Sequence, residues 1–141
     1  MNTYFEQMVL SASPMELIRI LYRQADMSVR KAREHLKGGR IAERAECINN
    51  AYEVMTELIA ALRPEEAPEI ATRLGELYGY MQRRLLEANF KQADEPLEEV
   101  LGLLAVLASA WAADPEPAPR AAAVSNRWAV AEPRAVQAVR A

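Results

Sequence analysis

Apolar residues recur at helical spacing in four consecutive segments of the chain. The segment from 40 to 63 is the most regular, because its apolar positions alternate steps of four and three, as helices do along the seam of a bundle. Segments 13–37, 68–92 and 95–113 show the same period. The apolar positions of the two most regular segments are Leu17, Leu21, Ala25, Val29, Ala32 and Leu36, and then Ile41, Ala45, Ile48, Tyr52, Met55, Ile59 and Leu62. The pattern predicts four amphipathic helices.

Start and stop signals separate these helices. Ser13, Pro14 and Glu16 combine an N-cap, a proline at the first helical position and the acidic third residue of a capping box. Gly38-Gly39 is typical of a helix end, prolines bracket the next turn, and Asp94 or Glu95 can cap the last helix. Short turns between helices of similar length predict an all-α, antiparallel up-down four-helix bundle over 13–113.

Two terminal segments lie outside this bundle. Residues 1–12 hold several large apolar side chains and one charge, Glu6, so they are expected to form a strap or short helix over the bundle. Residues 114–141 are rich in proline and alanine, without a long apolar period, and are expected to form a mobile tail. The pattern assigns no role to this tail.

The last two helices carry more apolar surface than one seam requires. The helix over 68–92 has one row that includes Leu74 and Leu77 and a second row that includes Tyr78 and Leu85. The helix over 95–113 is widened in the same way by Val100, Leu103 and Leu107. Two interpretations remain open: these residues widen the internal core, or they form a groove that receives a partner helix.

Composition narrows the function classes. The net charge of -3 argues against a nucleic-acid-binding protein, which needs concentrated Lys and Arg. Cys47 is the single cysteine, so no internal disulfide can form and a reducing compartment is favoured. The N-terminus lacks a signal-peptide pattern, and the uncharged run over 100–113 is too short for a bilayer. These features predict a cytoplasmic protein without membrane insertion.

Catalytic and metal chemistry find little support in the sequence. His35 is the only histidine and no Glu-x-x-His pair occurs in the sequence, so no metal site is expected. Cys47 has no spaced histidine partner and is expected to be an inert thiol. The acidic residues over 94–99 fall in the first turns of a helix, where negative charge is favourable. The sequence therefore predicts no catalytic residues, no cofactor and no enzyme.

Several motifs, in order and at the right spacing, resemble the FliS family of flagellar export chaperones. The first is the run over 11–22, Ser-Ala-Ser-Pro-Met-Glu-Leu-Ile-Arg-Ile-Leu-Tyr. The second is Glu-Ile-Ala at 69–71 with Leu-Tyr-Gly-Tyr-Met at 77–81 and Arg-Leu-Leu-Glu-Ala-Asn at 84–89. Leu-Glu-Glu-Val at 97–100 and Ala110-Trp111 also fit, so the resemblance covers 4–111. The chain departs from the family at Arg23-Gln24, where Asp-Gly is frequent, and at Ala67-Pro68, where Gly-Gly is frequent.

The resemblance implies a cytoplasmic helical bundle that binds the disordered C-terminal segment of flagellin. Binding would prevent premature polymerisation and hold flagellin for the flagellar type III export apparatus, and export-gate or regulatory flagellar proteins are further partners to consider. The free form is expected to be a monomer or weak dimer. The alternative is a helical homodimeric adaptor without chaperone activity. Together with the surplus apolar rows, the resemblance places partner binding at Tyr4, Met8, Val9, Tyr78, Leu85, Asn89, Val100, Leu103 and Leu107.

Overall fold

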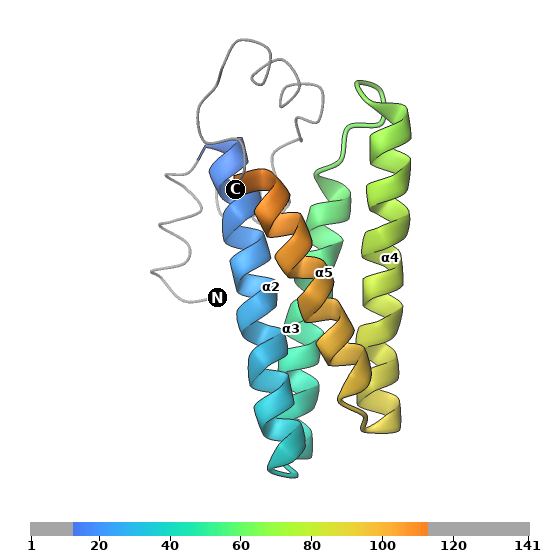
Figure 1. The fold of residues 1–141 in the computed structure, drawn as a ribbon. Helices are drawn as coiled ribbons and strands as arrows, with labels where there is room; N and C mark the ends of the chain where they lie inside the picture. The colour runs from blue at the N-terminus through green and yellow to red at the C-terminus, as the bar shows by residue number, and fades with distance from the viewer. Residues whose placement is uncertain (1–12, 113–141) are drawn as a thin grey trace, which may run out of the picture.

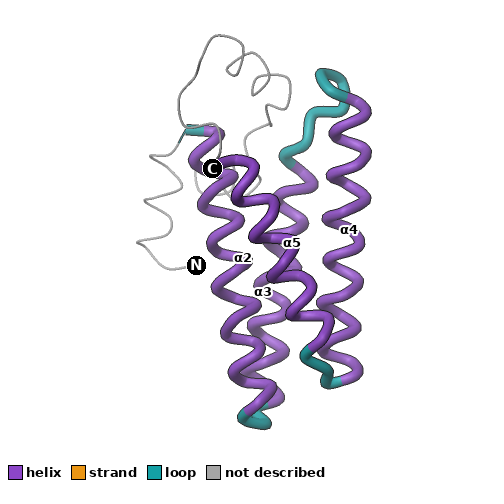
Figure 2. Tube along the Cα trace, in the orientation of Figure 1, coloured by secondary structure: helices purple, strands orange, loops and turns teal. Residues whose placement is uncertain are grey.

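The computed structural model describes residues 13–112, and these form four helices joined by short turns (Figures 1 and 2). The helices are α2 (Pro14–Lys37), α3 (Ile41–Ala60), α4 (Pro68–Lys91) and α5 (Glu95–Ala112). Each helix packs against the next one along the chain, and α5 returns to pack against α2. The described part of the protein is therefore an all-α four-helix bundle, as the periodicity predicted.

Local signals in the sequence explain where α2 begins and ends. The Ser13 Oγ accepts a hydrogen bond from the Glu16 backbone N–H at 3.2 Å, and Pro14 occupies the first turn. At the other end, the N–H of Gly38 bonds the Glu34 carbonyl, and Gly39 takes a φ of 70°, a conformation that glycine adopts without strain. These caps satisfy backbone groups that a helix end leaves without partners.

The core runs through the centre of the bundle and draws on all four helices. Its largest fully buried side chains are Tyr22, Tyr78, Ile18, Ile48, Met55, Leu58, Met81, Leu85, Leu97, Leu104 and Val29. Burying such side chains stabilises the fold by roughly 1.5–3 kcal/mol each before conformational entropy is counted.

The buried stripe of α3 is rotated from the one that the heptad pattern predicted. Ile41, the first residue of that seam, is 60% exposed, whereas Ala51 and Leu58, outside the seam, are almost completely buried. Ile48 and Met55 of the predicted row are buried, but Tyr52 and Ile59 are only half-buried, and the Tyr52 backbone carbonyl accepts a hydrogen bond from Gln82 of α4 at 3.1 Å. Because α3 packs against both α2 and α4, its buried side chains extend beyond the predicted row.

The predicted strap over 1–12 and the predicted tail over 114–141 lie outside the described residues. Within the described helices, none is long and apolar enough to cross a membrane.

Candidate functional site

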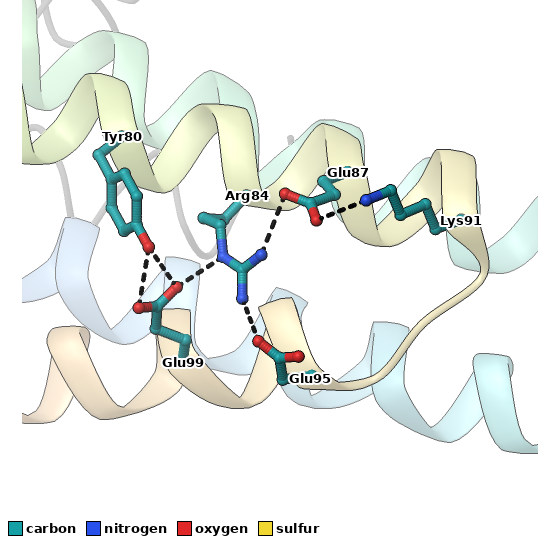
Figure 3. A network of polar contacts seen from close by, with 6 residues as sticks. All are labelled: Tyr80, Arg84, Glu87, Lys91, Glu95 and Glu99. Carbon is teal, nitrogen blue, oxygen red and sulfur yellow. Dashed lines mark hydrogen bonds and ion pairs between the residues drawn. The ribbon is translucent and has the colours of Figure 1, made fainter.

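A cluster of ionic contacts joins the second half of α4 to the beginning of α5 (Figure 3). The Arg84 guanidinium donates to Glu95 and Glu99, at 2.6 Å each, and to Glu87 at 3.0 Å. The Tyr80 hydroxyl donates to the Glu99 carboxylate at 2.8 Å, and Lys91 pairs with Glu87. The hydrogen bonds from Tyr80 and Arg84 lower the pKa of Glu99, and those from Lys91 and Arg84 lower the pKa of Glu87. We call these six residues the ionic clamp.

The far end of α5 is attached to α2 instead. The Trp111 indole N–H donates to the Tyr22 hydroxyl at 2.9 Å, and the Trp111 carbonyl accepts from Arg19 at 3.2 Å. Figure 1 shows α5 running obliquely, beside α4 near its beginning and apart from α4 near its end. The α4–α5 pair is therefore held together at one end and diverges toward the other.

This divergence leaves a row of leucines incompletely covered. Continuing the antiparallel register of the Arg84–Glu95 and Tyr80–Glu99 contacts along the two helices assigns Leu77 to the level of Leu103 and Leu74 to the level of Leu107. All four pack against the core yet remain only half-buried, and Val106, which precedes Leu107 in the sequence, is 68% exposed. No charged residue occurs in α5 after Glu99. We call Leu74, Leu77, Leu103 and Leu107 the leucine surface.

Three residues that the sequence placed in a partner groove lie inside the core. Tyr78 is 2% exposed, Leu85 is 0% exposed and Val100 is 1% exposed. The hydroxyls of Tyr78 and Tyr22 lie 2.6 Å apart, and burial raises the pKa of both. In this conformation their surfaces are used by neighbouring helices, so the widened-core interpretation describes these three positions.

Asn89 has a structural contact of its own. Its side-chain oxygen accepts a hydrogen bond from the Nε of Arg44 at 3.0 Å, and its backbone carbonyl accepts from the same guanidinium at 3.4 Å. Arg44 is only 5% exposed, so this contact satisfies a buried cation at the C-terminal turn of α4.

Of the nine predicted residues, Leu103 and Leu107 lie on the leucine surface, while Tyr4, Met8 and Val9 lie outside the described residues.

A pocket of about 460 Å³ opens between α3 and α4 at the turn that joins them. Its lining is mostly apolar and comes from Ile59, Leu62, Pro64, Ala71, Thr72, Gly75 and Glu76. The apolar pattern of the sequence does not predict this pocket, although Gly75 within a helical pattern is a signal for a close approach or an opening.

The described residues contain no group of His, Cys, Asp and Glu that could hold a metal ion. Cys47 is half-buried, and desolvation raises the pKa of its thiol, which disfavours the nucleophilic thiolate. The His35 Nδ1 accepts a hydrogen bond from the Nε of Arg40 at 2.8 Å, which gives this ring a local role at the end of α2.

Comparison with known proteins identifies the family. The model of the family described as "Flagellar protein FliS" matches residues 1–116. The chain is similar to a protein named flagellar secretion chaperone FliS from Salmonella typhimurium, with 42% identity over 75% of this chain and 79% of the relative. It is also similar to flagellar secretion chaperone FliSB from Pseudomonas aeruginosa (34% identity; 75% of this chain, 84% of the relative) and to the Bacillus subtilis flagellar secretion chaperone FliS (30% identity; 78% and 81%).

The names of these relatives are those of chaperones, a non-enzymatic class, as the sequence had led us to expect. The motifs at 11–22 and 69–89, the four-helix bundle and the family match over 1–116 all lead to one assignment. The chain belongs to the FliS family of flagellar secretion chaperones.

Proposed function

We propose that the protein is a cytoplasmic export chaperone whose client is the disordered C-terminal segment of flagellin. The bound client would be kept from polymerising and held for the flagellar type III export apparatus. Family membership supports a role in flagellar secretion, and the leucine surface supports an apolar helical client. Because a disordered segment loses entropy when it orders, such a complex remains releasable.

The observation that carries the proposal is the partial exposure of the leucine surface. A core position is normally sealed, but here two neighbouring helices present leucines at helical spacing that solvent reaches. An amphipathic client helix placed over Leu103 and Leu107 would cover them with its own apolar row. In this proposal the N-terminal residues Tyr4, Met8 and Val9 form a strap that covers part of the same surface and yields to the client.

Isothermal titration calorimetry and circular dichroism with a peptide from the C-terminus of the cognate flagellin test the proposal. We expect one-to-one binding with a gain in helicity, because the peptide orders as it binds. Leu107→Glu should weaken binding strongly, since it places a charge at the apolar contact. The matched control is Ala105→Glu, an exposed position on the outer face of α5, which should bind normally. Equal binding by both variants, or no binding by the wild type at high micromolar peptide, would contradict the proposal.

Sedimentation velocity separates this function from the homodimeric adaptor. A chaperone should be a monomer or weak dimer that forms a one-to-one complex with its client. An adaptor that buries the leucine surface against a second copy would remain a dimer upon dilution and ignore the peptide. In that case Leu107→Glu would dissociate the dimer.

A further inference from the structure

The α3–α4 pocket lies far from the ionic clamp, at the end of the bundle where α5 ends. Antiparallel connections place the turn between α3 and α4 at the same end as the end of α5 (Figure 1). The chain therefore leaves α5 at the end of the bundle that carries the pocket. Another 29 residues, 113–141, follow.

Gly75 keeps the pocket open. A Cβ at this position would meet only the Leu62 side chain, at 3.6 Å, which is an ordinary contact. The backbone there has no conformation that requires glycine, so its missing side chain has one visible effect: the pocket reaches the α4 backbone. Its volume is in the range that accommodates a bulky organic group.

The rim of the pocket is acidic. Glu76 lines it, and Glu65, Glu66 and Glu69 are exposed in the adjoining turn and the first turn of α4. Arg63 in the same turn pairs with Glu66 at 3.3 Å, and the exposed Arg73 follows Thr72 of the lining, so these two arginines offset part of the charge of the four glutamates. A segment that combines an apolar anchor with basic residues would complement such a site.

The chain itself contains a segment of this chemistry. Residues 117–141 lie beyond the range that the family model matches, and they carry four arginines and a single glutamate. Trp128 is their only aromatic residue, directly after Arg127 and six residues before Arg134. By contrast, residues 1–12 carry only Glu6, whose charge has the same sign as the rim.

We propose that the segment around Trp128 docks in the α3–α4 pocket of its own chain, with the indole as anchor and Arg127 and Arg134 over the acidic rim. The 15 residues from 113 to 127 reach roughly 20 Å even as a flexible coil, and further where prolines extend them. Neighbouring helix axes in a bundle are about 10 Å apart, so this reach is sufficient. The docked segment would cover an apolar surface distinct from the leucine surface, and the proposal does not depend on the identity of the client.

Fluorine NMR of the full chain labelled with 5-fluorotryptophan tests the docking. The two tryptophans give two resonances, which Trp128→Phe assigns. We expect the Trp128 resonance to show a smaller solvent-isotope shift in the native protein than in urea. Gly75→Leu should fill the pocket and restore the solvent-exposed value. Gly102→Leu is the matched control, because a side chain at Gly102 would meet nothing within 4 Å, and it should leave the docked signal unchanged.

A second pair of variants keeps the test decisive if Gly75→Leu fails to fold. Arg127→Glu alters only the terminal segment and should release Trp128, while Arg127→Glu combined with Glu76→Arg should restore docking at least in part. Raising salt should also release the indole, since screening weakens the rim contact.

A native Trp128 resonance with the full isotope shift would overturn the proposal. So would a protected resonance that ignores both Gly75→Leu and Arg127→Glu, because the indole would then lie elsewhere. Protection that vanishes upon dilution would identify a second copy, not the same chain, as the occupant.

Discussion

The hydroxyl of Tyr22 joins three helices inside the core, and its removal should cost more than removal of its partner on α4. The Trp111 indole N–H donates to it from α5, and the Tyr78 hydroxyl lies 2.6 Å away on α4. Tyr22→Phe removes two buried hydrogen bonds, whereas Tyr78→Phe removes one and leaves Tyr22 bonded to Trp111. Both residues are 2% exposed, so water does not readily replace the lost partners.

The magnitudes follow from the cost of an unsatisfied buried group. Tyr22→Phe should lower the free energy of unfolding by about 2–4 kcal/mol, because both the Tyr78 hydroxyl and the Trp111 N–H lose this partner. Tyr78→Phe should lower it by about 1 kcal/mol. The double variant should cost less than the sum of the two, since the second substitution removes a hydroxyl that the first one left without Tyr22.

Urea unfolding followed by far-ultraviolet circular dichroism measures these differences, with the denaturant slope held common to all variants. Thermal midpoints should follow the same order, at roughly 4–8 °C per kcal/mol for a bundle of this size. Equal losses for Tyr22→Phe and Tyr78→Phe, or strictly additive losses in the double variant, would refute the reasoning.

Three further predictions concern stability. Acid should destabilise the protein, because hydrogen bonds lower the pKa values of three carboxyl groups in the folded state. Lys91 and Arg84 lower the pKa of Glu87, Tyr80 and Arg84 lower that of Glu99, and Arg33 lowers that of Asp94. This stability is fully present above the ordinary carboxyl pKa of about 4 and is lost as the pH falls through the lowered values, so thermal midpoints of the wild type should fall more steeply in acid than those of Arg84→Gln. Asn89→Ala should cost about 1–3 kcal/mol in urea unfolding, because Arg44 loses its side-chain acceptor. Asn49→Ala, the same substitution at an exposed position of α3, should be nearly neutral, and equal stability of the two variants would contradict the buried contact. Leu85→Ala should cost about 2–5 kcal/mol, while the exposed Leu86→Ala changes little, and a reversed order would place Leu85 outside the core.

Helix number, helix ends and topology could be predicted from the sequence because their determinants are local. The Ser13 cap, the Gly38-Gly39 stop and the prolines of the second turn act within a few residues. Short turns then leave an antiparallel arrangement as the simplest connection.

Which residues of the two apolar rows on α4 are buried was not local information, because both rows reach the core: Met81, on the row of Leu74 and Leu77, is fully buried. Leu77 and Leu85 belong to equally apolar rows, yet Leu85 is sealed and Leu77 is half-buried. What separates them is the oblique course of α5, which depends on contacts between residues far apart in the chain, such as Trp111 with Tyr22 and Arg84 with Glu95. The orientation of the buried stripe on α3 was not predicted for the same reason, since a heptad pattern cannot show that a helix packs against two neighbouring helices.

The clamp around Arg84 gives the α4–α5 pair a built-in polarity. A client lying along these two helices would contact the ionic clamp at one end. At the other end it would contact the part of α5 that lies apart from α4. Under the proposed function, dissociation of the client would begin at the divergent end and proceed toward the ionic clamp. The client would then leave in a fixed order along the helices instead of dissociating at all contacts at once.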